Sequence, residues 1–174
     1  MSIHHVRALA TCTATLALAM LTTPAAALTR NLVLQQNGTG ACQAALPNFE
    51  GVIRKRPLAI QNEGASTSFV TCSPPSLQGL VANDTLGYNI RLVNRGSSLV
   101  SVNCTAVIGS DGVTNPLVVY LPKNANIGGN SNAVLTWRTL EGYDTSVPFN
   151  VQCELPPGVG ISGIQTNQTL DVGN

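Results

Sequence analysis

The sequence predicts an all-β protein, a two-sheet antiparallel β-sandwich of immunoglobulin-like or jelly-roll-like topology. Three observations predict this fold class. Apolar and polar residues alternate along short segments, turn-forming residues separate these segments, and four cysteines after residue 27 can form two disulfides. No stretch beyond residue 27 shows the three-to-four-residue apolar spacing of a helix over three turns. A closed β-barrel is the alternative fold.

The clearest alternation lies in segment 149–155, where Phe149, Val151 and Cys153 alternate with polar residues. Segments 88–92 and 100–108 show the same pattern. A strand of this kind packs one face on a core and exposes the other. Further strands are expected in segments of similar character: 32–35, 52–61, 68–72, 117–121, 133–139 and 164–172.

Turn-forming residues separate these strands. Residues 94–97, Asn-Arg-Gly-Ser, link two alternating segments and predict a hairpin turn. Segment 37–47 is expected to be a loop that Cys42 anchors. Other breaks are marked by short turn sequences: Asp111-Gly112, Gly128-Gly129 and Pro156-Pro157-Gly158.

Residues 1–27 predict a secretory signal peptide, whose apolar part would form a helix. Arg7 precedes an uncharged segment rich in Ala and Leu, and Ala25 and Ala27 form a small-x-small cleavage site. Cleavage there would make Leu28 the first residue of the mature chain. The apolar segment is too short and too rich in Thr for a membrane-spanning helix, which needs about 20 apolar residues.

The mature chain, residues 28–174, is expected to form a single β-sandwich domain that is secreted or periplasmic. It has no histidine, because His4 and His5 lie in the signal peptide, and it carries eight acidic and eight basic residues. A net charge of zero disfavours nucleic acid or an anionic membrane as a partner. No second apolar segment suggests a membrane span.

An even number of cysteines in an exported chain indicates disulfides. Cys104 and Cys153 both fall on the apolar side of alternating strands, so they point into the core and can pair there. Cys42 would then pair with Cys72 and tie the N-terminal segment to the sandwich. Zinc binding is disfavoured, because the spacing contains no CxxC pair and no histidine is present.

No catalytic, cofactor or metal site is predicted. Nucleophilic hydrolysis usually needs a histidine base, which the mature chain lacks. A glycosidase needs only two carboxylates, but Glu141 and Asp144 lie in a predicted turn, where acidic residues are common. Segment 124–130 alternates oxygen ligands as a calcium loop does, but it lacks the carboxylates on which calcium sites rely. The protein is therefore expected not to be an enzyme.

Two features are weak candidates for binding. Arg54 and Arg56 would share one face of a strand and could contact sulfate, phosphate or an acidic polysaccharide. The favoured alternative is an edge strand that charge and Pro57 protect from aggregation. Trp137 could stack on a sugar, but it shares a strand face with Leu135, which favours core packing.

Several strings resemble a group of uncharacterised small exported proteobacterial proteins: 56–64, 69–73, 153–161 and 171–174. The resemblance spans residues 42–174. It implies bacterial export and a β-sandwich with two disulfides, and it implies no activity, ligand or catalytic residue.

Three functions are compatible with these observations. The first is a non-catalytic binding or structural protein, such as an adhesion, envelope or matrix component, with an envelope protein or a polysaccharide as its partner. The second is a carbohydrate-binding module with an aromatic platform. The third is a carboxylate-only hydrolase, which would need two facing carboxylates about 5–9.5 Å apart. The platform of the second would come from Trp137, Tyr88, Tyr120 or Tyr143.

Overall fold

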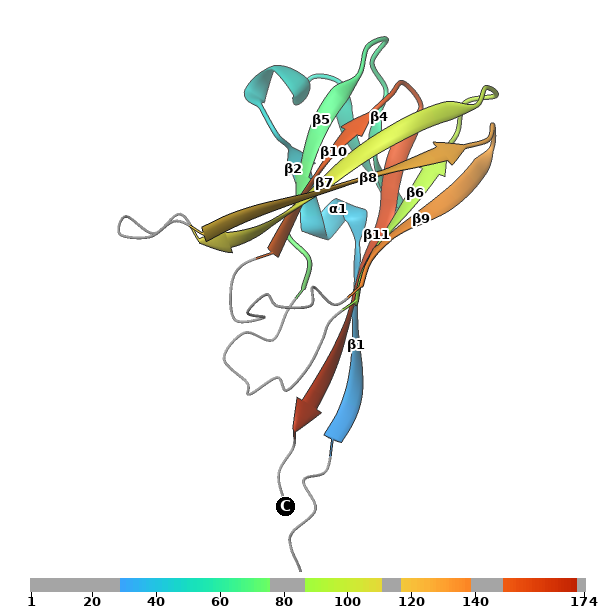
Figure 1. Cartoon of the computed structure of the whole chain (residues 1–174). Helices are drawn as coiled ribbons and strands as arrows, with labels where there is room; N and C mark the ends of the chain where they lie inside the picture. The colour runs from blue at the N-terminus through green and yellow to red at the C-terminus, as the bar shows by residue number, and fades with distance from the viewer. Residues whose placement is uncertain (1–28, 76–86, 111–116, 139–148, 172–174) are drawn as a thin grey trace, which may run out of the picture.

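The computed structural model describes residues 29–75, 87–110, 117–138 and 149–171. There, antiparallel strands form two sheets that pack face to face (Figure 1). Sheet A contains β1 (Thr29–Asn37), β3 (Ile53–Arg56), β4 (Ala59–Asn62), β6 (Gly87–Asn94), β9 (Ser131–Trp137) and β11 (Val159–Asp171). Sheet B contains β2 (Cys42–Ala44), β5 (Ser68–Cys72), β7 (Val100–Ser110), β8 (Leu117–Ile127) and β10 (Phe149–Leu155).

The strand order confirms the predicted sandwich and resolves its topology. Sheet A runs β3-β4-β11-β6-β9 and sheet B runs β2-β5-β10-β7-β8, while β1 pairs with β11. From β4 onward, each strand is followed by a strand of the other sheet, except that β8 follows β7 within sheet B. This double-sheet arrangement of eight strands is that of a jelly roll.

The core forms where the apolar sides of the two sheets meet. Tyr88 stacks on Phe149 with ring centroids 3.7 Å apart, and Trp137 meets the same ring edge-on at 6.5 Å. Burial raises the pKa of Tyr88. The fully buried aliphatic residues come from both sheets, as a two-layer fold requires: Ile60, Val70, Ile90, Leu92, Val102, Val151, Leu155, Ile161 and Ile164.

The structure contains both predicted disulfides, Cys42–Cys72 and Cys104–Cys153. Each links directly opposite residues of neighbouring strands within sheet B. All four cysteines are buried, so the first bridge is as much a part of the interior as the second.

Two buried asparagines hold the corners where the chain passes from sheet A to sheet B. The side-chain oxygens of Asn62 and Asn94 each accept a hydrogen bond of 2.9 Å from the backbone N–H two residues later. Their side-chain nitrogens donate to the ends of sheet B strands, at Leu155 O (2.7 Å) and Ile127 O (3.2 Å). The hairpin predicted at 94–97 is therefore wrong, because this turn joins strands of different sheets.

Two other predicted segments differ in detail. Segment 52–61 is not one strand, because the chain reverses at Pro57-Leu58 and β3 pairs with β4. Segment 37–47 is not simply a loop: it contains the short helix α1 (Gly38–Ala41), the edge strand β2 and the start of a 3₁₀ turn, Pro47–Phe49. Gly38 allows α1 to approach β11, since a Cβ atom there would lie 2.1 Å from Ile161 O.

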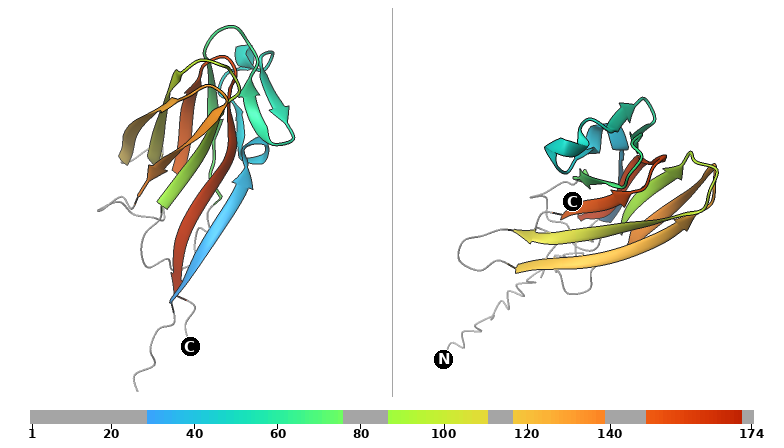
Figure 2. Two further views of the ribbon diagram at one scale, coloured as in Figure 1. Left: turned by 90° about the vertical axis from the view of Figure 1, so that its right-hand side faces the viewer. Right: turned by 90° about the horizontal axis from the view of Figure 1, so that it is seen from above.

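Strand β1 pairs with β11 over its whole length, from Thr29–Asp171 to Asn37–Gly163. The far ends of these two strands extend beyond the sandwich as a ribbon (Figure 2). In the described parts of the chain, no helix is long and apolar enough to cross a membrane. The predicted signal peptide and its cleavage residues Ala25, Ala27 and Leu28 lie outside these parts.

Candidate ligand-binding face

The outer face of sheet B is built from the polar sides of alternating strands. On β10, Gln152 and Glu154 point outward between buried residues. Directly opposed residues of antiparallel strands project to the same face. The register therefore places the outward side chains of three strands in two rows, Thr71-Gln152-Thr105 and Phe69-Glu154-Asn103.

Except for Thr71, the residues of these rows line a depression of about 240 Å³, which extends to β8. Tyr120 of β8 lies opposite Val107 and is 66% exposed. Phe69, at the other side, is half-buried and contacts Phe49 with ring centroids 5.7 Å apart. Phe69 and Tyr120 stand three strand spacings apart across the sheet, about 14 Å, and are offset by four residues along the strands, about 13 Å, so roughly 20 Å separates them on a diagonal. Two aromatic rings therefore flank a polar floor.

Two side chains on the floor of the depression have no hydrogen-bond partner among the described residues. Asn103 donates to Glu154 Oε2 at 3.1 Å. Thr105 and Gln152 make no side-chain hydrogen bond to the described segments of the chain. An amide and a hydroxyl together offer both donors and acceptors, so these two residues can bind a polar ligand without first breaking a bond to any described residue.

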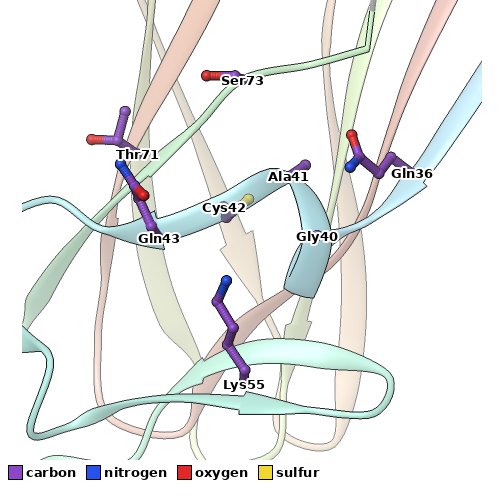
Figure 3. A pocket seen from close by; sticks show the side chains of 8 residues that line it. All are labelled: Gln36, Gly40, Ala41, Cys42, Gln43, Lys55, Thr71 and Ser73. Atoms are coloured by element: carbon purple, nitrogen blue, oxygen red, sulfur yellow. The ribbon is translucent and has the colours of Figure 1, made fainter.

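A second pocket, of about 290 Å³, lies where the edge strands β2 and β3 approach α1. Its lining is polar and includes Gln36, Gln43, Lys55, Thr71 and Ser73. In Figure 3 the Lys55 ammonium group points toward β2, close to Cys42. We name this cavity the edge pocket.

The basic run, which was considered as an anion contact but interpreted preferentially as a protected edge strand, divides into residues with different roles. Arg56 forms two hydrogen bonds of 2.6 Å with the two carboxylate oxygens of Glu63. This contact holds the pKa of Glu63 below its ordinary value and raises that of Arg56. Arg56 is therefore already paired with an internal carboxylate. Arg54 is exposed on the edge strand β3 and does not line the edge pocket.

Trp137, which was considered as a residue that could stack on a sugar, does not form a binding surface. It is 1% exposed, and its indole N–H donates to Leu121 O at 2.9 Å. Lys123 lies over its ring, 5.9 Å from the centroid. Tyr88 is also buried. Of the four aromatic residues considered as a platform, Tyr120 is exposed, and Tyr143 lies outside the described residues.

The segment considered as a calcium loop, 124–130, supplies none of the described residues that line either pocket. Residues 124–127 belong to β8 rather than to a loop. In the part of the chain that the structure describes, no group of three His, Cys, Asp or Glu residues could hold a metal ion. Glu141 and Asp144, the pair considered for a hydrolase, lie outside that part.

The floor residues Asn103, Thr105, Gln152 and Glu154 were not predicted as a site. Their sequence signal was the polar half of two alternating segments, which indicates an exposed face and no more. The depression depends on which strands lie side by side.

No protein-family model matches the chain, and no curated protein matches it. Solved structures with a similar fold include the C-terminal CBM6 of LamC, a marine laminarinase from Zobellia galactanivorans, with 8% identity, 78% of this chain and 98% of that chain covered, and a TM-score of 0.46. CBM35 of Abf62 from Cellvibrio japonicus matches with 17% identity, coverages of 79% and 92%, and a TM-score of 0.38. The mannan-recognising module TmCBM27 matches with 13% identity, coverages of 81% and 96%, and a TM-score of 0.38. At these identities and TM-scores the likeness is confined to the fold.

Proposed function

We propose that this protein is an exported, non-catalytic carbohydrate-binding protein that holds a glycan chain on the outer face of sheet B. One observation carries the proposal: the depression between Phe69 and Tyr120, whose floor contains Thr105 and Gln152, two side chains without a hydrogen-bond partner among the described residues.

The chemistry of this surface suits a sugar. A pyranose ring has C–H groups on its faces and hydroxyl groups around its rim. An exposed ring such as Tyr120 offers a large apolar surface with a polar tip. Amide, hydroxyl and carboxylate groups on the floor can donate to and accept from sugar hydroxyls.

The size of the depression favours a chain over an enclosed small molecule. Sites that enclose small molecules usually have volumes of about 300–1,000 Å³, and this depression has about 240 Å³. Its aromatic ends stand roughly 20 Å apart on a diagonal of the sheet. An extended ligand can contact both ends without being engulfed.

The same residues support binding rather than hydrolysis. A glycosidase usually requires two carboxyl groups. Glu154 is the single carboxylate among the described residues that line the depression, and Asn103 donates to it. Nucleic acid is a poor alternative, because none of the described residues that line this depression is basic.

Export is supported by the two disulfides, because such bonds persist in oxidising compartments. The signal peptide predicted at residues 1–27 agrees with a secreted or periplasmic location.

A glycan array probed with the mature protein tests this proposal. We expect retention on at least one class of polysaccharide. Tyr120→Ala should weaken binding by about 30-fold, since truncating an aromatic anchor costs about 2 kcal/mol. Val134→Ala is the matched control, because it removes an exposed apolar side chain from sheet A. Equal affinities of the two variants would contradict the proposal.

A further inference from the structure

The edge pocket has a charge that the depression lacks. Lys55 is the only ionisable side chain among the described residues that line it. The other polar groups, on Gln36, Gln43, Thr71 and Ser73, are neutral. An ammonium group beside neutral hydrogen-bonding groups favours an anion, because it supplies a point charge with three donors.

Lys55 is free to act on a ligand. Among the described residues it takes part in no ion pair, whereas the neighbouring Arg56 is paired with Glu63. The run of three basic residues therefore provides one cation that faces a cavity rather than three equivalent surface charges.

The edge pocket is continuous with the proposed glycan-binding face. Gln43 of β2 lies opposite Thr71 of β5, which lies opposite Gln152 of β10. Thr71 lines the edge pocket, and Gln152 lines the depression. These residues occupy adjacent strands, spaced about 4.8 Å apart. A glycan chain that lies across the sheet can therefore place one sugar in the depression and another near Lys55.

We propose that the edge pocket binds the acidic group of a sugar, so that the ligand of this face is an acidic polysaccharide. The anion is a uronic acid carboxylate or a sulfate ester. This inference rests on the proposed function, because the sugar chain must lie on sheet B. A purely protective role of Lys55 at a sheet edge makes a different prediction, since it would affect aggregation and not ligand choice.

Calorimetry with paired ligands tests the inference. The probes are an oligogalacturonate and its carboxyl-reduced form, and a sulfated galactan oligosaccharide and its desulfated form. We expect the protein to bind one acidic probe about tenfold more tightly than its neutral counterpart. The preferred pair identifies carboxylate or sulfate as the anion.

Variants of β3 separate a local contact from general charge. Lys55→Gln should abolish the preference for the acidic probe and leave affinity for its neutral counterpart unchanged, whereas Lys55→Arg should retain part of the preference. Arg54→Gln is the control, because it removes the same charge from the same strand outside the pocket. It should keep the preference. Melting curves confirm that each variant is folded.

The outcomes distinguish the two proposals. Equal affinity for acidic and neutral probes, or equal effects of Lys55→Gln and Arg54→Gln, would overturn the acidic-sugar inference and leave glycan binding standing. If neither these probes nor any glycan on the array binds, both proposals are wrong.

Discussion

The outer faces of the two sheets have similar residue types but differ in how their polar side chains are bonded. On sheet A, Thr136 donates to Asn89 at 2.7 Å, and Gln165 donates to Asn167 at 2.8 Å. On sheet B, Asn103 likewise donates to Glu154 at 3.1 Å, but Thr105 and Gln152 have no such partner among the described residues. A polar group that is hydrogen-bonded within the protein is less available to a ligand. Two faces of similar residue composition can therefore differ in their ability to bind one.

The two faces also differ in their exposed apolar residues. Sheet A exposes Val33 and Val134, which are 57% and 52% accessible. Sheet B exposes Tyr120 beside the depression. A valine presents little flat surface to a ligand, whereas an aromatic ring presents a plane with a polar tip. The outer face of sheet B therefore combines the exposed ring of Tyr120 with two polar side chains, Thr105 and Gln152, that have no partner among the described residues.

The largest effect is expected from filling the depression. Thr105→Arg places a long charged side chain on its floor and should lower glycan affinity on the order of 100-fold, because a ligand can no longer reach the centre of the site. Val134→Arg makes a comparable change on sheet A and should leave affinity within twofold. Calorimetry measures both. Comparable losses would show that the two faces do not differ in function.

A pair of glutamine variants should separate binding from stability. Gln152→Ala removes from sheet B an amide that has no hydrogen-bond partner among the described residues, so it should lower glycan affinity about fivefold with little change in melting temperature. Gln165→Ala removes a hydrogen-bonded amide from sheet A. It should lower the free energy of unfolding by about 1 kcal/mol and leave affinity unchanged. The opposite pattern in denaturation and binding assays would reverse the assignment of the faces.

The smallest effect concerns the Arg56–Glu63 pair at the edge of sheet A. The pKa of Glu63 is lowered from its ordinary value of about 4.5, so the pair stabilises the fold fully above that pH. This contribution is lost as the pH falls through the lowered pKa. Between neutral pH and acid, the melting temperature of Glu63→Gln should therefore fall slightly less than that of the wild type. A steeper fall in the variant would contradict this sign.

Local patterns predicted much of the fold. The predicted bounds of β5 and β10 match the structure, because these strands are short and bear a clear apolar or alternating pattern. The turn after Asn94 could not be assigned in the same way. Its Asn and Gly signal a change of direction, but a hairpin and a passage between sheets share that signal. The choice between a hairpin and a passage between sheets depends on the distant end of β8, which Asn94 contacts.

The candidate site was predictable only in part. Tyr120 was among the aromatic residues considered, but sequence alone could not show that Tyr88 and Trp137 are buried while Tyr120 is exposed. Alternation separates Lys55 from Arg54 and Arg56, but it could not show that Arg56 is paired and that Lys55 lines a pocket. The difference is the Glu63 carboxylate, which β4 and the segment after it bring beside Arg56.

The central claim is that glycans bind to sheet B and not to sheet A. Backbone amide chemical shifts, followed by NMR during titration with the best ligand from the array, test it most directly. The account predicts the largest shifts at Thr105, Tyr120 and Gln152, with Asn89 and Gln165 unchanged. Shifts centred on Asn89 and Gln165, with the sheet B residues unaffected, would contradict it.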